Sequence, residues 1–232
     1  MRTNEDLLDD FAIRSFRDTG DEDYICARMA FRAALVTPSL WASQQAVEKY
    51  LKCILLLNRI KAPKVFHDLG KALGKIEGSG KVSLNLTAPT RQFIEYLDDC
   101  GRFRYQEIST VAFGQSLVAL DRTVWELRRY CTLSESPRRT SLRHGEPPPI
   151  VQIPGGYLEK IVGDMKHLAR VPLIRNNGFF GTRRRRRVRV HKWMTATNAP
   201  LYSNPRILEE VQEYVHLPGD VVAGYRNHTK RH

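Results

Sequence analysis

The sequence predicts a mainly α-helical protein, in which an up-and-down helical bundle is followed by a basic C-terminal extension of mixed α and β structure. Apolar residues recur at helical spacing through residues 20–133, which favours the bundle. From Ser134 to Pro154 the chain is instead rich in Ser, Arg, Gly and Pro, which is typical of a linker or an exposed loop. We therefore expect a helical bundle (1–133), a Pro/Arg-rich linker or loop (134–155) and a basic extension (156–232).

The composition is that of a globular protein located inside the cell. Hydrophobic residues make up 42% of the 232 residues, which is an ordinary proportion. No apolar run approaches the ~18 residues of a membrane span, and the acidic N-terminus lacks the pattern of a signal peptide. The four cysteines are widely spaced, with no CxxC pair, so we expect buried reduced thiols in a helical core. We expect a cytoplasmic location, no metal and no cofactor.

Five helices are predicted in the bundle. The first begins at the acidic run 21–23, whose charges suit the helix dipole. The second begins at Thr37-Pro38, an N-cap followed by a first-turn proline. The third begins at residues 67–69 and ends near 78–80, and the fourth begins at Pro89. The fifth follows a 3-4-3-4 apolar rhythm over residues 117–131, which suits antiparallel packing.

Charge is unevenly distributed along the chain. The net charge is +12, and residues 145–232 carry 15 Lys and Arg against 7 Asp and Glu. This asymmetry favours a polyanionic partner, nucleic acid before membrane. Within the extension we expect a helix over 157–168, a strand over 171–174, a turn over 176–178, a half-buried strand over 187–191 and a helix over 207–215.

The arginine run in the extension is the strongest binding signal. Because each phosphate that is neutralised releases counterions, such a run supplies affinity for nucleic acid that does not depend on sequence. Phe179, Phe180 and Trp193 could offer stacking surfaces or could belong to the core. The alternatives are a solvated strand edge or pairing with an acidic partner protein. The predicted nucleic-acid-binding residues are Arg183, Arg184, Arg185, Arg186, Arg187, Arg189 and Lys192.

Three motifs resemble the HEPN domain family. Residues 41–52, which read WASQQAVEKYLK, resemble the second-helix pattern of that family. His67-Asp68-Leu69 resembles the start of its third helix, and Arg104-Tyr105 resembles the end of its fourth. The resemblance covers roughly residues 20–133. It implies a helical bundle that dimerises, in a setting of toxin–antitoxin, antiphage and RNA-processing proteins.

Many HEPN proteins are metal-independent ribonucleases with an Arg-x(4–6)-His motif near the last helix of the bundle. The predicted fifth helix here contains arginines but no histidine. Two clusters match the spacing, Arg138 or Arg139 before His144, and residues 184–186 before His191. In such an enzyme the histidine acts as the base and the arginine stabilises the phosphate charge. His144 with Arg139 is the better placed candidate, and an exposed basic linker is the alternative.

A second candidate site lies within the resemblance to the HEPN family. Its polar residues could line a cleft that binds phosphate or a nucleotide. The alternative is a solvated helix face with i, i+4 ion pairs, in which His67 caps or hydrogen-bonds the start of a helix. The residues of the predicted cleft are Glu48, Lys49, Lys52, His67, Arg104 and Tyr105.

The sequence thus predicts a HEPN-like nucleic-acid-binding protein, RNA-directed and of defence or toxin–antitoxin type. We expect a homodimer that binds RNA or DNA and does not bind membrane. One alternative is a metal-independent endoribonuclease. Another is a non-catalytic module that binds nucleotides or partners a nucleotidyltransferase.

Overall fold

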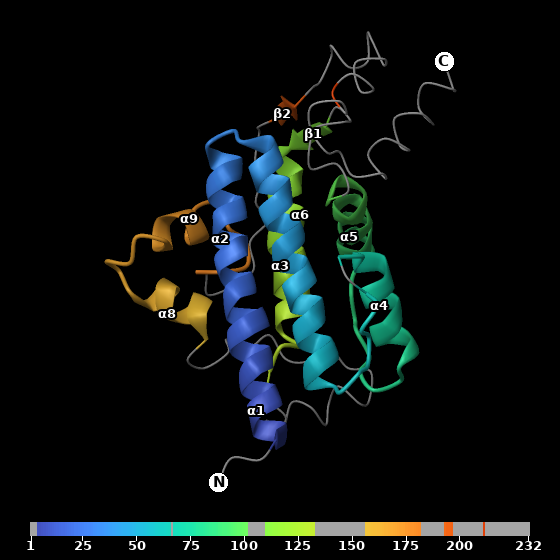
Figure 1. Cartoon of the computed structure of the whole chain (residues 1–232). Helices are drawn as coiled ribbons and strands as arrows, with labels where there is room; N and C mark the ends of the chain where they lie inside the picture. The colour runs from blue at the N-terminus through green and yellow to red at the C-terminus, as the bar shows by residue number, and fades with distance from the viewer. Residues whose placement is uncertain are drawn as a thin grey trace, which may run out of the picture.

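A computed structural model describes residues 4–65, 67–101, 110–132, 156–181, 193–196 and 211. The described structure is mainly helical (Figure 1). Three helical segments, α1 (Asn4–Phe11), η1 (Ala12–Asp18) and α2 (Thr19–Arg32), follow one another without a break. The chain then reverses and returns along α2 as α3 (Val36–Leu57), the longest described helix.

Three further helices complete the bundle around α3. They are α4 (Leu69–Gly78), α5 (Ala88–Gly101) and α6 (Gly114–Arg128). Helix α3 packs against α2, α4, α5 and α6, so it occupies the centre of the bundle. Two four-residue strands, β1 (Thr110–Phe113) and β2 (Trp193–Ala196), pair in antiparallel orientation, with Thr110 opposite Ala196 and Phe113 opposite Trp193.

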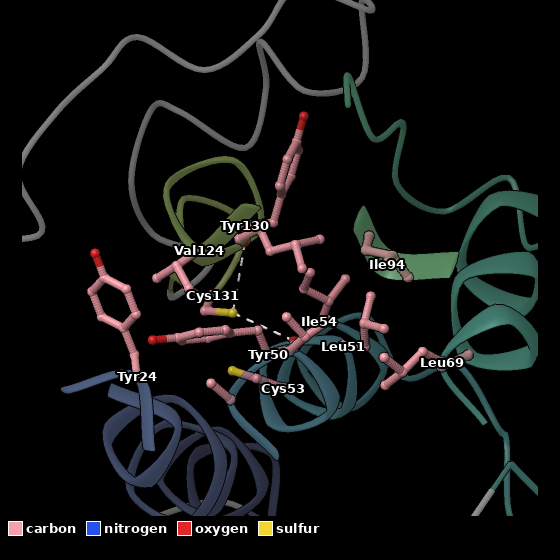
Figure 2. Packing of buried hydrophobic residues seen from close by; sticks show 14 of the residues in the cluster. Tyr24, Tyr50, Leu51, Cys53, Ile54, Leu69, Ile94, Val124, Tyr130 and Cys131 are labelled. Carbon is pink, nitrogen blue, oxygen red and sulfur yellow. Dashed lines mark hydrogen bonds between the residues drawn. The ribbon is translucent and has the colours of Figure 1, made fainter. Parts of the chain in front are cut away.

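The core lies around the inner face of α3. Tyr50, Leu51 and Ile54 are fully buried there, and Figure 2 shows Tyr50 beside Cys131, which follows α6. The Cys131 Sγ lies 3.6 Å from the backbone oxygen of Tyr50 and donates to it. Cys53 and Cys131 are buried free thiols, as predicted. The prediction is wrong for Cys26 on α2, which is exposed.

The N-terminal helix is longer than the sequence analysis predicted. Helix α2 begins at Thr19, not at the acidic run 21–23, and it continues the helical segments α1 and η1. Helix α3 likewise begins before the predicted cap. Its N-cap is Leu35, which has no side-chain cap hydrogen bond. Val36 is buried beside Phe31 and Leu117, and this apolar contact fixes the start of the helix in place of a polar cap.

The predicted starts of the third and fourth helices agree closely with α4 and α5. Asp68 is the N-cap of α4, because its Oδ1 accepts a hydrogen bond from the backbone N–H of Lys71 at 2.7 Å. Helix α4 ends at Gly78, and Gly80 then takes a φ of 64°, which glycine adopts without strain. Helix α5 begins at Ala88, with Pro89 in its first turn.

The described part of the extension packs directly on the bundle. It contains α8 (Tyr157–Gly163) and α9 (Arg170–Ile174), which lie beside α2 in Figure 1. Buried Leu158, Ile161, Leu173 and Phe180 belong to the same core cluster as the bundle. The helix predicted over 157–168 is therefore present but ends at Gly163.

The strand predicted over 171–174 is wrong, because these residues form α9. Periodicity does not separate a buried strand from a helix in an apolar run this short. The strand predicted over 187–191 lies outside the described residues. So does the helix predicted over 207–215, apart from Val211, which is helical. The mixed α and β character of the extension therefore stays a prediction.

Candidate functional site

A buried carboxylate and an exposed imidazole meet between α3 and the start of α4. Glu48, on α3, is 6% exposed, whereas the His67 side chain is 60% exposed. The His67 Nδ1 lies 3.0 Å from Glu48 Oε2 and 3.1 Å from Oε1. The Lys52 ammonium donates to Glu48 Oε1 at 2.6 Å. The Glu48 carboxylate is therefore held by two partners and fixes the orientation of the His67 ring.

This geometry determines what the histidine can do. When Nδ1–H donates to a carboxylate, the neutral ring carries its lone pair on Nε2. Nε2 of His67 is then the atom able to accept a proton from a bound hydroxyl, which is the role of a general base. An acidic partner that orients a histidine in this way is a recurrent part of catalytic sites.

The start of α4, next to this pair, is already satisfied by carboxylates. Asp98 on α5 accepts from the backbone N–H of Leu69 at 2.9 Å and from that of Gly70 at 3.4 Å. Asp68 accepts from Lys71 as the N-cap. A helix N-terminus binds phosphate through free N–H groups and its positive dipole end. The two aspartates occupy these groups, so this helix end does not favour an added phosphate.

The structure brings together part of the predicted phosphate or nucleotide cleft. Glu48, Lys52 and His67 form one hydrogen-bonded cluster. Lys49 instead reaches α2, where its Nζ lies 2.6 Å from Asp23 Oδ2, so it contributes to helix packing rather than to the cluster.

Arg104 and Tyr105 lie outside the described residues. The alternative of a solvated helix face with i, i+4 ion pairs holds in part, because Lys52 and Glu48 form such a pair but Glu48 is only 6% exposed.

The other predicted site residues also lie outside the described part of the chain. These are the catalytic candidates His144 and Arg139, with Arg138 and His191. The nucleic-acid-binding residues Arg183, Arg184, Arg185, Arg186, Arg187, Arg189 and Lys192 lie there too. Their roles stay predictions.

A buried ion pair, which the sequence did not predict, joins the bundle to the extension. Arg128 on α6 donates from Nε and Nη2 to the two carboxylate oxygens of Asp21 on α2, both at 2.7 Å. It also donates to both oxygens of Glu159 on α8, at 2.7 and 2.9 Å. The Tyr50 hydroxyl donates to Asp21 Oδ1 at 2.7 Å. We call this arrangement the Arg128 clamp.

A second buried arginine ties α2 to α6 and α9. Arg28 is fully buried and pairs with Asp121 on α6. Its Nε and Nη2 donate to the backbone oxygens of Pro172 and Arg175, at 3.0 and 2.7 Å. Asn177 donates from Nδ2 to the Tyr24 hydroxyl at 2.8 Å, and that hydroxyl donates to Asp121 at 2.6 Å. We call this arrangement the Arg28 clamp.

Burial raises the pKa of the buried aspartate in each clamp. Loss of solvation raises the pKa of the Asp21 carboxyl above its ordinary value, although Arg128 opposes the effect. The pKa of Asp121 is raised for the same reason, against the effect of Arg28. Burial also raises the pKa of the Tyr24 hydroxyl well above its usual range, so this group remains a neutral donor.

Both clamps are structural, and apolar contacts reinforce them. The rings of Trp125 and Phe180 meet edge to face with centroids 5.2 Å apart, and Tyr24 packs on Phe180 at 5.6 Å. Phe179 lies 6.2 Å from Trp125. Phe180 therefore belongs to the core, and Phe179 is partly buried against it. The side chain of Trp193 lies outside the described part of the structure.

The fold defines a class of protein, an up-and-down helical bundle with a C-terminal segment clamped to one side. The comparison with protein families assigns part of this bundle to a known domain family. Residues 13–109 match the family model of the HEPN domain. This match begins in η1 and ends before β1, which leaves α6 and the extension outside it. Comparisons with curated proteins and with solved structures gave no match.

Two properties of the described residues bear on function. No described helix combines the length and the apolar character required to cross a membrane. No group of three or more His, Cys, Asp or Glu side chains within the described ranges is placed to hold a metal ion. Within those ranges, the Glu48–His67 pair is the arrangement that most resembles a catalytic site.

Proposed function

We propose that this protein is an RNA-binding HEPN-domain protein of defence or toxin–antitoxin type, which acts as a homodimer in the cytoplasm. The observation that carries the proposal is the arginine run at residues 183–187, in a segment with 15 basic and 7 acidic residues. The HEPN family supports it, because the family is associated with nucleic-acid and ribonuclease roles. The role of nucleotidyltransferase partner stays an alternative prediction.

The two clamps anchor the chain just before the arginine run to the bundle. The run begins two residues beyond Gly181, and the chain just before Gly181 is held by Asn177 and Phe180. The Asn177 Oδ1 accepts from the backbone N–H groups of Phe179 and Phe180, at 2.9 and 3.0 Å. A cationic segment that starts from an anchored point loses less freedom when it binds a phosphate backbone.

The test measures the affinity for a fluorescently labelled single-stranded RNA by anisotropy. Replacing the five arginines 183–187 with serine should weaken binding at least tenfold at about 0.1 M salt, because five phosphate contacts are lost. An unchanged affinity would refute the proposal. A matched control removes five positive charges from exposed positions on the bundle and should keep most of the affinity. The control positions are Lys61, Lys64, Lys71, Lys75 and Lys81.

The Glu48–His67 pair favours a second candidate function, a metal-independent endoribonuclease. A general base that deprotonates the 2′-hydroxyl of RNA needs a ring nitrogen with a lone pair that faces the substrate. In His67 this nitrogen would be Nε2, since Nδ1 contacts Glu48. The candidate pair His144 and Arg139 would supply the same base and a phosphate-binding cation from outside the described residues.

One gel in excess EDTA separates these sites. Labelled RNA is incubated with wild type, His67→Ala, His144→Ala and the control His167→Ala, whose histidine is exposed in a turn. If His67→Ala alone no longer cleaves the RNA, the base belongs to the Glu48–His67 pair. If His144→Ala alone no longer cleaves it, the active site lies beyond the bundle. Intact RNA with wild type refutes the ribonuclease hypothesis and leaves the RNA-binding proposal standing.

A further inference from the structure

The segment that forms α8, α9 and the turn between them carries four cations without acidic partners. They are Lys160, Lys166, Arg170 and Arg175, and all but the half-buried Arg170 are exposed. Within the described part of the chain, none of the four side chains forms an ion pair, whereas bundle cations such as Arg59 are paired with an acid. We call these four residues the α8–α9 cations. Figure 1 shows the turn between the two helices projecting away from α2.

The acids nearby do not cancel this charge. Glu159 is bound by two hydrogen bonds in the Arg128 clamp. Asp164 accepts a backbone N–H hydrogen bond within the turn at 2.9 Å. Glu22 on α2 lies close to Tyr157, at the end of α8 that is remote from the turn. The segment therefore presents an excess of positive charge to solvent, which attracts a polyanion.

Positive charges gather where α9 ends beside α2. The pKa of Arg32 on α2 is lowered there, by partial burial and then by the nearby charges of Arg175 and Arg28. Asp121 balances the charge of Arg28 in the Arg28 clamp. The backbone oxygen of Arg175 accepts from Arg28 Nη2 at 2.7 Å, so this residue is anchored while its side chain is exposed. A bound phosphate would relieve the repulsion between these guanidinium groups.

The start of the arginine run lies at this same end of α9. Gly181 has a φ of 72°, and a Cβ there would come within 2.5 Å of Ile174 Cγ2, so its backbone passes directly over Ile174. Ile174 is the neighbour of Arg175 in the chain. The arginine run begins two residues after Gly181, a distance of at most about 7 Å along the chain. The α8–α9 cations and the arginine run can therefore contact one continuous ligand.

The turn also exposes apolar side chains in an ordered arrangement. Leu168 is 94% exposed, Met165 is 75% exposed and Val171 is 58% exposed. The His167 Nδ1 accepts from the backbone N–H of Ala169 at 3.1 Å, and this bond fixes the backbone on both sides of Leu168. A ligand that suits this segment has both negative charge and apolar faces. Unstacked bases on a phosphate backbone supply both.

We propose that the α8–α9 segment is a second part of the RNA-binding surface and binds the same single-stranded RNA as the arginine run. The α8–α9 cations contact phosphates, and Leu168 packs against an unstacked base. This surface extends the proposed RNA-binding site, on which the inference rests. Because the two clamps hold α8 and α9 on the bundle, the surface is formed before RNA binds, which lowers the entropy cost of binding.

The test measures the anisotropy of a labelled single-stranded RNA of about 20 nucleotides, which is long enough to reach both surfaces. The triple variant Lys160→Gln, Lys166→Gln and Arg175→Gln should bind at least tenfold more weakly at about 0.1 M salt, because three phosphate contacts are lost. For the same reason, the slope of log K against log salt should become less negative by about 2. Arg170 is kept, because its Nε donates to the backbone oxygen of Val162 at 3.0 Å and holds the turn.

A matched control removes the same charge from exposed lysines that form no ion pair in the described structure, and it should bind like wild type. It carries Lys61→Gln, Lys64→Gln and Lys75→Gln. If the arginine-run variant loses affinity but the triple variant binds like this control, the inference is overturned while the RNA-binding proposal stands. If wild type does not bind RNA, both are overturned.

Leu168→Ser tests the base contact, with Met29→Ser as a control on an exposed apolar residue of α2. Leu168→Ser should weaken RNA binding by about threefold or more and leave the salt slope unchanged, because an apolar contact is lost and no charge changes. An affinity equal to that of Met29→Ser would refute the base contact.

An anionic membrane is the other surface that basic and apolar side chains fit. The same variants are therefore sedimented with vesicles that contain phosphatidylserine. If the triple variant and Leu168→Ser bind RNA like wild type but lose binding to these vesicles, the segment is a membrane contact and the proposal is overturned.

Discussion

Replacing Arg128 with methionine tests the Arg128 clamp most sharply. Arg128 is 3% exposed and makes four hydrogen bonds to Asp21 and Glu159, at 2.7 to 2.9 Å. Methionine fills a similar volume without the charge. The Asp21 carboxylate, which is fully buried, then retains the Tyr50 hydroxyl as a partner but loses its counter-charge. Removing one partner of a buried ion pair costs about 3–5 kcal/mol of unfolding free energy.

Urea unfolding followed by circular dichroism measures this loss. With a slope of about 2 kcal/mol per molar urea, the expected loss moves the midpoint down by about 2 M. A variant that removes both charges, Asp21→Asn with Arg128→Met, should recover part of the stability, since no unpaired charge stays buried. A loss below about 1 kcal/mol in Arg128→Met, or a double variant less stable than the single one, would refute this reasoning.

Three further perturbations follow from the same contacts, each measured by urea unfolding. Leu173→Ala should cost about 2–5 kcal/mol, since Leu173 is fully buried where α9 meets the bundle; a loss under about 1 kcal/mol would show that α9 is not anchored. Asp68→Ala should cost about 1 kcal/mol through the lost cap of α4, and Asp68→Asn, which keeps an accepting oxygen, should cost less. Burial raises the pKa of Asp121 above 3.8, so the folded chain binds more protons than the unfolded chain just above that pH. Unfolding free energy contributed by Asp121 should therefore fall as pH rises through this interval, and Asp121→Asn should remove that fall. An unchanged pH dependence would contradict the assignment.

Periodicity and caps predicted most of the bundle, because its helices are long and amphipathic. Asp68 begins α4 as expected, since a side-chain cap is a local signal. The N-terminal helix was missed, although Leu8, Phe11 and Phe16 follow a helical spacing there. Their face is only partly covered in the fold, and the acidic residues between them weaken the apolar pattern.

The buried clamps could not be predicted from sequence for a different reason. Arg28 and Arg128 lie on helices, and arginine in a helix is predicted to be exposed because arginine is mostly found at protein surfaces. Their partners are far away along the chain, with Arg128 bonded to Asp21 and to Glu159. Both arginines are buried where the extension packs on the bundle. The Glu48–His67 pair was predicted in part, because the HEPN motifs placed both residues in one cleft.

The salt dependence of RNA binding tests the central claim most directly. For single-stranded nucleic acid, the logarithm of the association constant falls against the logarithm of salt concentration with a slope of about −0.7 for each phosphate contact. If residues 183–187 make five such contacts, replacing these arginines with serine should make the slope less negative by about 3.5. The control that replaces the five exposed bundle lysines should keep the wild-type slope. Equal slopes for wild type and the arginine variant would contradict the account.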